Sequence, residues 1–327
     1  MIRYAFVLAA LVAFQASAQT SSPFDKSSGR AFPNRPMRLV TGYPPGGAAD
    51  FVARIAADEL SKELGVPVIV DNRPGAGGNI GAETVAKAPA DGYTLLNTSD
   101  KAVNIALYKN PGYAEKDFSG VIRIARGIVV ILVNRDSPFK SLKDVVGYAR
   151  ANPEKLLNAS AGYGSSPHLA SVLFESVAGV KFTSVQYKGG APATQSLMGG
   201  ETQINFATSA TVMGFVRAGR VRALAVSTRH ASPSVPGVPG AEEAGLPGYD
   251  FNVSFGLYVP AATPRATVHR LHAAAFKGLS KPEAREKLAL QGMDVALSSS
   301  PELFDKEVKA EAPYWENLVR KSGAKVE

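Results

Sequence analysis

Short apolar segments alternate along the chain with segments whose apolar residues recur every three or four positions. Over residues 49–64 this recurrence marks one face of a helix, and Gly65 follows at a position typical of a helix end. Ser166 and Pro167 are typical of a helix start. The predicted strands cover residues 37–43, 66–70, 93–97, 156–160, 182–188, 203–207 and 222–227. This regular alternation predicts an α/β fold with doubly wound, parallel sheets.

Two further apolar segments, 121–134 and 251–260, are longer than the strands around them. Each is roughly twice the length of an average strand of about 5–6 residues. A chain that crosses twice between two lobes would need such crossover strands. We therefore expect two sheets in two lobes, with lobe 1 formed by residues 35–130 and 254–327 and lobe 2 by residues 131–253.

The first 18 residues have the organisation of a secretion signal. Arg3 precedes an apolar run from Ala5 to Phe14, and Ala16-Ser17-Ala18 matches a small-x-small cleavage site. The apolar run is shorter than the ~20 residues that cross a bilayer as a helix. We predict a signal peptide over residues 1–18, cleavage after Ala18, and a mature protein in the periplasm.

Composition narrows the class of protein. With 45% apolar and 20% charged residues in 327, the chain can bury large cores and is not a disordered protein. The absence of cysteine excludes disulfides, thiolate zinc sites and cysteine nucleophiles. The net charge is +8, but Lys and Arg are scattered singly, so no nucleic-acid partner is expected.

Two glycine-rich turns could bind an anion. Gly46-Gly47 precedes the helix over 49–64, and Gly162–Pro167 has the same place before a helix in the other predicted lobe. Free backbone amides at a helix start bind anions, and ligands of open α/β sheets bind at the carboxyl ends of strands. Such turns also serve as plain strand-to-helix connections, so a single turn does not indicate an anion site. The presence of one such turn in each predicted lobe does indicate one.

Other chemistry finds little support. The run Gly75–Gly81 has Ile80 where a dinucleotide-binding motif needs glycine, and neither a P-loop nor a G-x-S-x-G nucleophile motif occurs. His269 and His272 are three residues apart but lack a nearby acidic ligand, so we expect no metal site. His168 follows the second glycine-rich turn and either lines a cleft or packs beside it. No catalytic residues and no cofactor are predicted.

Several motifs match a known family. The strongest are Tyr43–Asp50, Val70–Gly81 and Asp91–Leu96, and further matches lie at Tyr187–Ala193 and Arg217–Ser227. Over essentially the whole mature chain the sequence resembles the Bug family, the periplasmic receptors of tripartite tricarboxylate transporters. The resemblance implies a two-lobed Venus-flytrap periplasmic binding protein. Such a receptor, expected to be a monomer and not an enzyme, closes on a small organic carboxylate and delivers it to the transporter's membrane subunits.

The resemblance also implies a set of ligand-binding residues. It places a carboxylate clamp in the first loop, at Tyr43, Pro45, Gly46, Gly47 and Ala48. It places the remaining cleft contacts in both lobes, at Ser99, Ser160, Ser165, Ser166, His168, Tyr187, Gly189 and Ala191. Asp50 belongs to the first motif and also suits a helix start, so it either meets the ligand or holds the loop.

Ala207 departs from the family pattern, because many members have aspartate at this place. A methyl group offers a ligand ammonium neither an acceptor nor a negative charge. We therefore expect a di- or tricarboxylate, or an apolar monocarboxylate, in preference to an amino acid. Thr208, Ser209 and Asp100 are alternative acceptors for such an ammonium.

Two rival functions stay open at this point. The chain could present its bound acid to a signalling partner as a sensor, which differs from transport only in that partner. It could also be an enzyme on the same scaffold, in which case a bound acid would be turned over.

Overall fold

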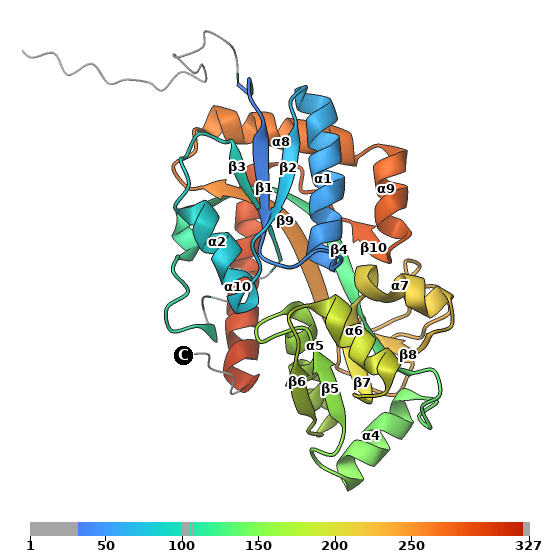
Figure 1. Cartoon of the computed structure of the whole chain (residues 1–327). Helices are drawn as coiled ribbons and strands as arrows, with labels where there is room; N and C mark the ends of the chain where they lie inside the picture. The colour runs from blue at the N-terminus through green and yellow to red at the C-terminus, as the bar shows by residue number, and fades with distance from the viewer. Residues whose placement is uncertain (1–31, 100–104, 106, 323–327) are drawn as a thin grey trace, which may run out of the picture.

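The computed structural model describes residues 32–99, 105 and 107–322, and in this part the chain forms two lobes (Figure 1). Lobe 1, the upper half of Figure 1, contains β1 (Met37–Thr41), β2 (Val68–Asn72), β3 (Thr94–Thr98), β9 (Asn252–Pro260) and β10 (Met293–Val295). Lobe 2 contains β5 (Leu157–Ser160), β6 (Thr183–Gln186), β7 (Ile204–Thr208) and β8 (Val221–Val226). The predicted two-lobed α/β fold is confirmed.

Strand β4 (Phe118–Asn134) belongs to both lobes. It pairs with β9 as far as Ile128 and with β7 from Val129 onwards, so the two sheets share this strand. The main path of the combined sheet is β2-β1-β3-β9-β4-β7-β5-β6, with β8 and β10 also paired to β4. The chain returns from lobe 2 through β9, which completes the second predicted crossing.

The strand directions differ from the prediction in one respect. β1 pairs in parallel with β2 and β3, and β5 with β6 and β7, but every strand that pairs with β4 is antiparallel to it. The reason lies in the crossings. In lobe 2, β4 arrives from lobe 1 and runs opposite to β7 and β8, and in lobe 1, β9 arrives from lobe 2 and runs opposite to β3. β10 follows a helix of lobe 1 and also runs opposite to β4. The sheets are therefore mixed.

Helices cover both faces of each sheet. Lobe 1 has α1 (Ala48–Leu64), η1 (Ala76–Gly78), α2 (Asn79–Ala86), η2 (Glu115–Asp117), α8 (Arg265–Leu279), α9 (Pro282–Ala289) and α10 (Pro301–Ser322). Lobe 2 has α4 (Leu142–Ala151), α5 (Ser166–Ala178), α6 (Gly190–Gly199) and α7 (Ser209–Arg217). Gly65 ends α1 in the left-handed conformation, and α5 begins at Ser166, as the sequence predicts.

Alternating residues of β1 show how the lobe 1 core is built. Met37 and Leu39 join the apolar cluster under α1 and α8, whereas Val40 joins a second cluster with residues of α2 and α10. Successive side chains of a strand point to opposite faces, so one short strand serves both layers.

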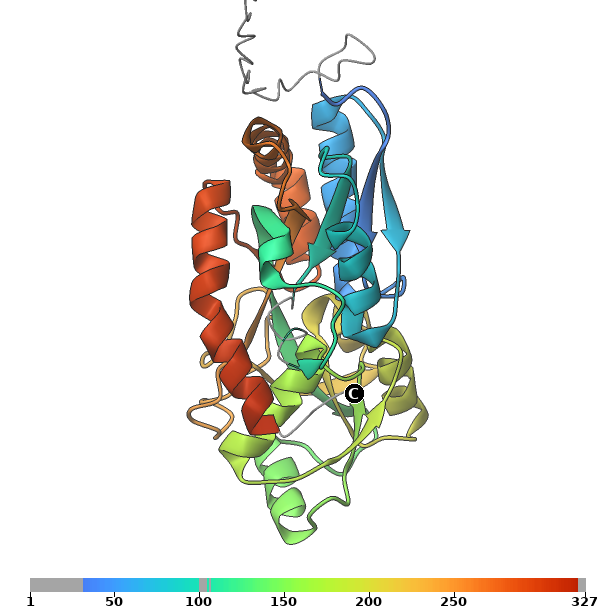
Figure 2. The same cartoon turned by 90° about the vertical axis from the view of Figure 1, so that its left-hand side faces the viewer.

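Helix α10 lies along the side of the molecule and contacts both lobes (Figure 2). In lobe 1 Phe304 packs on Tyr258, with ring centroids 5.1 Å apart. Further along the helix, Trp315 packs against Phe251, and Leu318 is buried in the core that includes α5. The helix therefore adds packing across the two lobes beside the strand crossings.

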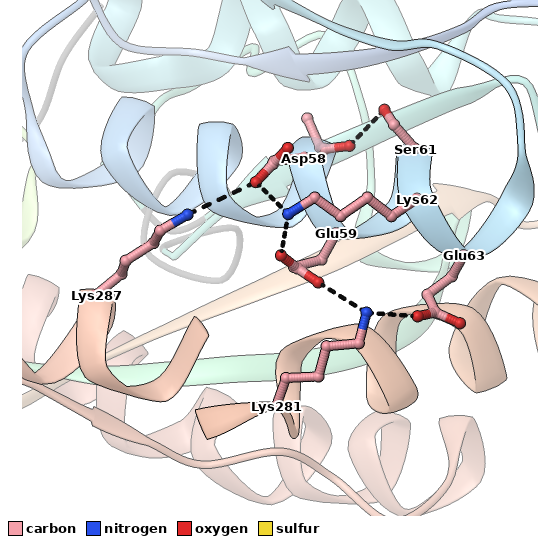
Figure 3. A network of polar contacts seen from close by, with 8 residues as sticks. Asp58, Glu59, Ser61, Lys62, Glu63, Lys281 and Lys287 are labelled. Atoms are coloured by element: carbon pink, nitrogen blue, oxygen red, sulfur yellow. Dashed lines mark hydrogen bonds and ion pairs between the residues drawn. The ribbon is translucent and has the colours of Figure 1, made fainter. Parts of the chain in front are cut away.

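A network of ion pairs fastens α1 to the helices behind it (Figure 3). Lys281 lies 3.3 Å from Glu59 and 2.7 Å from Glu63, and Lys277 lies 2.8 Å from Glu63. Hydrogen bonds from these two lysines lower the pKa of Glu63 to about 2. Lys62 adds a contact of 2.7 Å to Glu59 within α1. These contacts join the last turns of α1 to α8 and to the start of α9.

Candidate functional site

A cavity of about 50 Å³ lies between the lobes. Lobe 1 contributes Tyr43, Pro44, Pro45, Gly47, Ala48, Ala49, Ser99 and Phe255 to the lining. Lobe 2 contributes Ala161, Ser165, Ser166, Pro167, Gly189, Gly190, Ala191, Thr208 and Thr211. A molecule bound there would touch both lobes.

Four helices begin at this cavity. Gly47, Ser165, Gly189 and Thr208, which all line it, are the residues that precede the first turns of α1, α5, α6 and α7. Each helix amino end carries a partial positive charge of roughly +0.5. Among the described residues that line the cavity, none has a charged side chain. The site therefore favours an anion through backbone amides and hydroxyl groups.

Asp50 holds the first loop in place from behind. It is 4% exposed and accepts hydrogen bonds from the Gly46 amide at 3.1 Å and from Asn72 and Arg54 at 2.9 Å. Burial raises the pKa of Asp50, but the bonds from Arg54, Asn72 and Gly46 outweigh it, so its pKa lies below the ordinary value. Because the Gly46 amide is committed to Asp50, the amides that begin α1 at the cavity belong to Gly47, Ala48 and Ala49.

Tyr43 is held by hydrogen bonds of both its backbone carbonyl and its side-chain hydroxyl. The Asn72 amide that binds Asp50 also donates to the Tyr43 carbonyl at 2.9 Å. The Tyr43 hydroxyl donates to the Gly77 carbonyl at 2.8 Å. The loop is therefore tied to the end of β2 and to the glycine-rich turn that follows it.

The second loop is held by its own side chains. The Ser165 hydroxyl donates to the Gly162 carbonyl at 2.7 Å and accepts from the His168 amide at 3.4 Å. The His168 ring is buried behind the loop, where its Nδ1 accepts from the Gly164 amide at 3.3 Å. Burial lowers the pKa of His168 to about 4, so the ring is neutral at pH 7 and supplies no positive charge.

This low pKa predicts an acid-sensitive protein. In the unfolded chain His168 takes up its proton near pH 6.5, but in the folded protein only near pH 4, so acidification between these values favours unfolding. We expect the free energy of unfolding to fall by about 2 kcal/mol from pH 7 to pH 5 through this group. Urea unfolding at both pH values measures it. His168→Gln should remove most of that fall, and an equal fall in both proteins would contradict the assignment.

The lobes touch each other around the cavity. The hydroxyl oxygens of Ser99 in lobe 1 and Ser166 in lobe 2 are 3.5 Å apart. A Cβ atom on Gly189 would lie 2.9 Å from Cγ of Pro44, across the cleft. The structure therefore shows the lobes in contact, and the absence of a side chain at Gly189 permits that approach.

Most residues expected at the site line the cavity. These are Tyr43, Pro45, Gly47, Ala48, Ser99, Ser165, Ser166, Gly189 and Ala191. Gly46, Asp50, Ser160, His168, Tyr187 and Ala207 are not part of the lining.

The reasons for these exceptions are local. The Tyr187 hydroxyl donates to Ser196 at 2.6 Å, within lobe 2. Ser160 is 1% exposed, at the end of β5. Ala207 packs in an apolar cluster of lobe 2, because neighbouring residues of β7 point to opposite faces, and Thr208 reaches the cavity instead. The expectation that the Ala207 methyl group faces the ligand is thus corrected.

Sequence reasoning did not assign Thr211 or Phe255 to the cleft. Thr211 lies in the first turn of a helix after a strand, a place where a hydroxyl could have been noticed. Phe255 lies within the long strand β9 and carries no local signal of a site. Only the tertiary arrangement brings this ring to the cavity.

Two further kinds of site find no support in the part of the chain that the structure describes. No group of three or more His, Cys, Asp or Glu side chains is arranged to hold a metal ion there. Within the same residues, no helix has the length and apolar character that a bilayer crossing requires.

Known proteins resemble this chain over most of its length. Residues 52–323 match the family described as the tripartite tricarboxylate transporter family receptor. A protein from Pseudomonas sp. (strain P51), named for the tcbD-tcbE intergenic region, is 39% identical over 292 residues, covering 88% of this chain and 87% of that protein.

Solved structures agree with that match. The R. palustris protein Rpa4515, determined with adipate, superposes with a TM-score of 0.86 at 34% identity, over 90% of this chain and all of that one. The periplasmic binding protein BugD has a TM-score of 0.84 at 30% identity, over 90% of this chain and all of that one. Both structures share the fold of this chain, and one of them is named a periplasmic binding protein.

Proposed function

The chain belongs to the tripartite tricarboxylate transporter receptor family, and we propose that it captures a small organic carboxylate between its lobes and delivers it to the membrane subunits of such a transporter. The observation that carries this proposal is the cavity where four helices begin and no charged side chain lines the described wall. The adipate bound to Rpa4515 supports a carboxylate ligand.

Several expectations join this proposal. The protein is exported to the periplasm after cleavage behind Ala18, a segment that lies outside the described residues. It works as a monomer without metal or cofactor, does not bind nucleic acid and does not convert its ligand. Lobe 1 comprises residues 35–130 and 254–327 and lobe 2 residues 131–253, a division that the change of β4 partners after Ile128 supports.

Calorimetry on ligand-stripped protein tests the function directly. The titrated acids are the α,ω-dicarboxylates from succinate to suberate, together with hexanoate. Saturable binding, with the acid recovered unchanged, would support a receptor. Conversion of the acid would indicate an enzyme, and the absence of binding by all of them would reject the proposed ligand class.

We predict discrimination against amino acids. An ammonium buried in this cavity would meet four positive helix ends and no acidic side chain among the described lining residues, and an unpaired buried charge is costly. Asp100, one of the acceptors considered from the sequence, lies outside the described residues. Adipate should bind at least about tenfold more tightly than 2-aminoadipate, a difference of about 1.4 kcal/mol. Calorimetric titration of both acids measures it, and tighter binding of 2-aminoadipate would overturn the prediction.

A further inference from the structure

Two threonine side chains in lobe 2 extend the proposed function to the far end of the ligand. We propose that the Thr208–Thr211 hydroxyl pair binds the second carboxylate of a dicarboxylate whose first carboxylate lies against the α1 amino end in lobe 1. The inference rests on the proposed carboxylate-receptor function and assigns a specificity-determining subsite to it.

An inventory of hydroxyl groups at the cavity points to this pair. The Tyr43 and Ser165 hydroxyls donate to the backbone carbonyls of Gly77 and Gly162, and the Ser99 and Ser166 hydroxyls lie 3.5 Å apart where the lobes touch. Thr208 and Thr211 both line the cavity, and their hydroxyl oxygens are 3.0 Å apart. One hydroxyl of the pair donates to the other, so the second hydrogen of the pair can be donated to a ligand oxygen.

Packing and hydrogen bonds within the protein fix the position of the pair. Thr211 packs against Gly190, where a Cβ atom would lie only 3.2 Å from its Cγ2 and 3.3 Å from its Oγ1. Next to Thr208, the Ser209 hydroxyl donates to the Gly292 carbonyl of lobe 1 at 2.7 Å, and Arg217 donates to the Leu290 carbonyl at 2.7 Å. Helix α7 is thus fastened at both ends, and its hydroxyls are preorganised.

The surroundings of the pair select for negative charge. Thr208 precedes the first turn of α7, and Gly190 lies in the first turn of α6 beside Thr211. Neither helix start is capped by a side chain of its preceding residue. Hydroxyls that donate next to two helix amino ends suit a carboxylate better than a methyl group.

The two lobes therefore offer separate polar contacts to a ligand. Gly47, Ala48 and Ala49 belong to lobe 1, whereas Thr208 and Thr211 belong to lobe 2, and Phe255 and Pro44 add apolar wall. A diacid with an apolar chain would meet polar groups at both ends. An apolar monocarboxylate would leave the threonine pair without a ligand partner, so the subsite distinguishes the two classes.

Titration of adipate and hexanoate into ligand-stripped protein tests the subsite, because these acids differ only in the second carboxylate. We expect Thr211→Val, which keeps the shape and removes the hydroxyl, to weaken adipate binding about tenfold to hundredfold, as for loss of one hydrogen bond to a charged group. Hexanoate should bind the wild type more weakly than adipate and should bind Thr211→Val as it binds the wild type.

Two more variants serve as controls, and thermal unfolding shows that each variant is folded. Thr211→Ser keeps the hydroxyl and should restore most of the adipate affinity. Thr84→Val removes a threonine hydroxyl on α2, outside the cavity lining, and should leave both titrations unchanged.

Each remaining outcome overturns the subsite. Unchanged adipate affinity in Thr211→Val, or an equal loss of affinity for adipate and hexanoate, would show that Thr211 does not bind the second carboxylate. If hexanoate binds and none of the dicarboxylates from succinate to suberate does, the subsite is rejected but the proposed receptor function still stands. Binding of none of these acids would reject both.

Discussion

A Gly47→Val protein should fold normally and lose adipate binding by at least about a hundredfold. Gly47 has φ −92°, which any residue adopts, and a Cβ atom there would lie 3.8 Å from the Pro44 carbonyl, an ordinary contact. The branched side chain would instead extend into the cavity that Gly47 lines. It would displace a carboxylate from the α1 amides, and two hydrogen bonds to a charged group are worth about 3 kcal/mol or more.

Thermal unfolding and calorimetry together measure this result. Valine is a poorer residue than glycine at a helix start, so a small loss of stability, on the order of 1 kcal/mol, accompanies the substitution. Gly147→Val, at an exposed position of α4 with nothing within 4 Å, is the matched control and should bind adipate like the wild type. Unchanged affinity in Gly47→Val would mean that the loop is only a helix start.

Asp50→Asn should destabilise the protein and weaken binding from outside the cavity. The carboxylate accepts from Gly46, Arg54 and Asn72, whereas an amide has a single acceptor oxygen and turns an N–H toward these donors. Leaving buried donors unpaired costs about 1–3 kcal/mol, so we expect the free energy of unfolding to fall by about 2 kcal/mol. The released loop must then be ordered when the ligand binds, which should lower the affinity about tenfold.

Urea unfolding and calorimetry check both effects. Asp58→Asn is the matched control, because Asp58 lies on the same helix with a half-exposed side chain that contacts Lys62 and Lys287. Exposed ion pairs contribute about 0–1 kcal/mol, so this variant should lose little stability and no affinity. A stable Asp50→Asn protein with normal affinity would show that the loop does not depend on Asp50.

Local patterns in the sequence were enough to predict where these helices and strands lie along the chain. The periodic apolar positions before Gly65 predicted α1 as far as its last turn, and Ser166 with Pro167 predicted the start of α5. The long apolar segments predicted β4 and β9, and with them the two lobes. Such signals act between residues a few positions apart, so they can be recognised in the sequence without knowledge of the fold.

The directions of the strands that pair with β4 and β9 could be known only from the tertiary structure. Alternating strands and helices indicated parallel sheets, and the strands β1–β3 of lobe 1 and β5–β7 of lobe 2 do pair in parallel. The antiparallel pairs all involve β4 or β9. For β4 and β9 the direction depends on which lobe the chain has just left, and no residue within the strand encodes this.

The site shows the same division between local and tertiary information. The sequence by itself determined the glycine-rich loops, since glycine and a helix start mark them wherever they lie. Only the tertiary structure decided that the Gly46 amide binds Asp50, that Ala207 faces the core, and that Thr211 and Phe255 line one cavity. Which way an amide or side chain points depends on partners far along the chain, and these partners come together only when the strands pair and the lobes close.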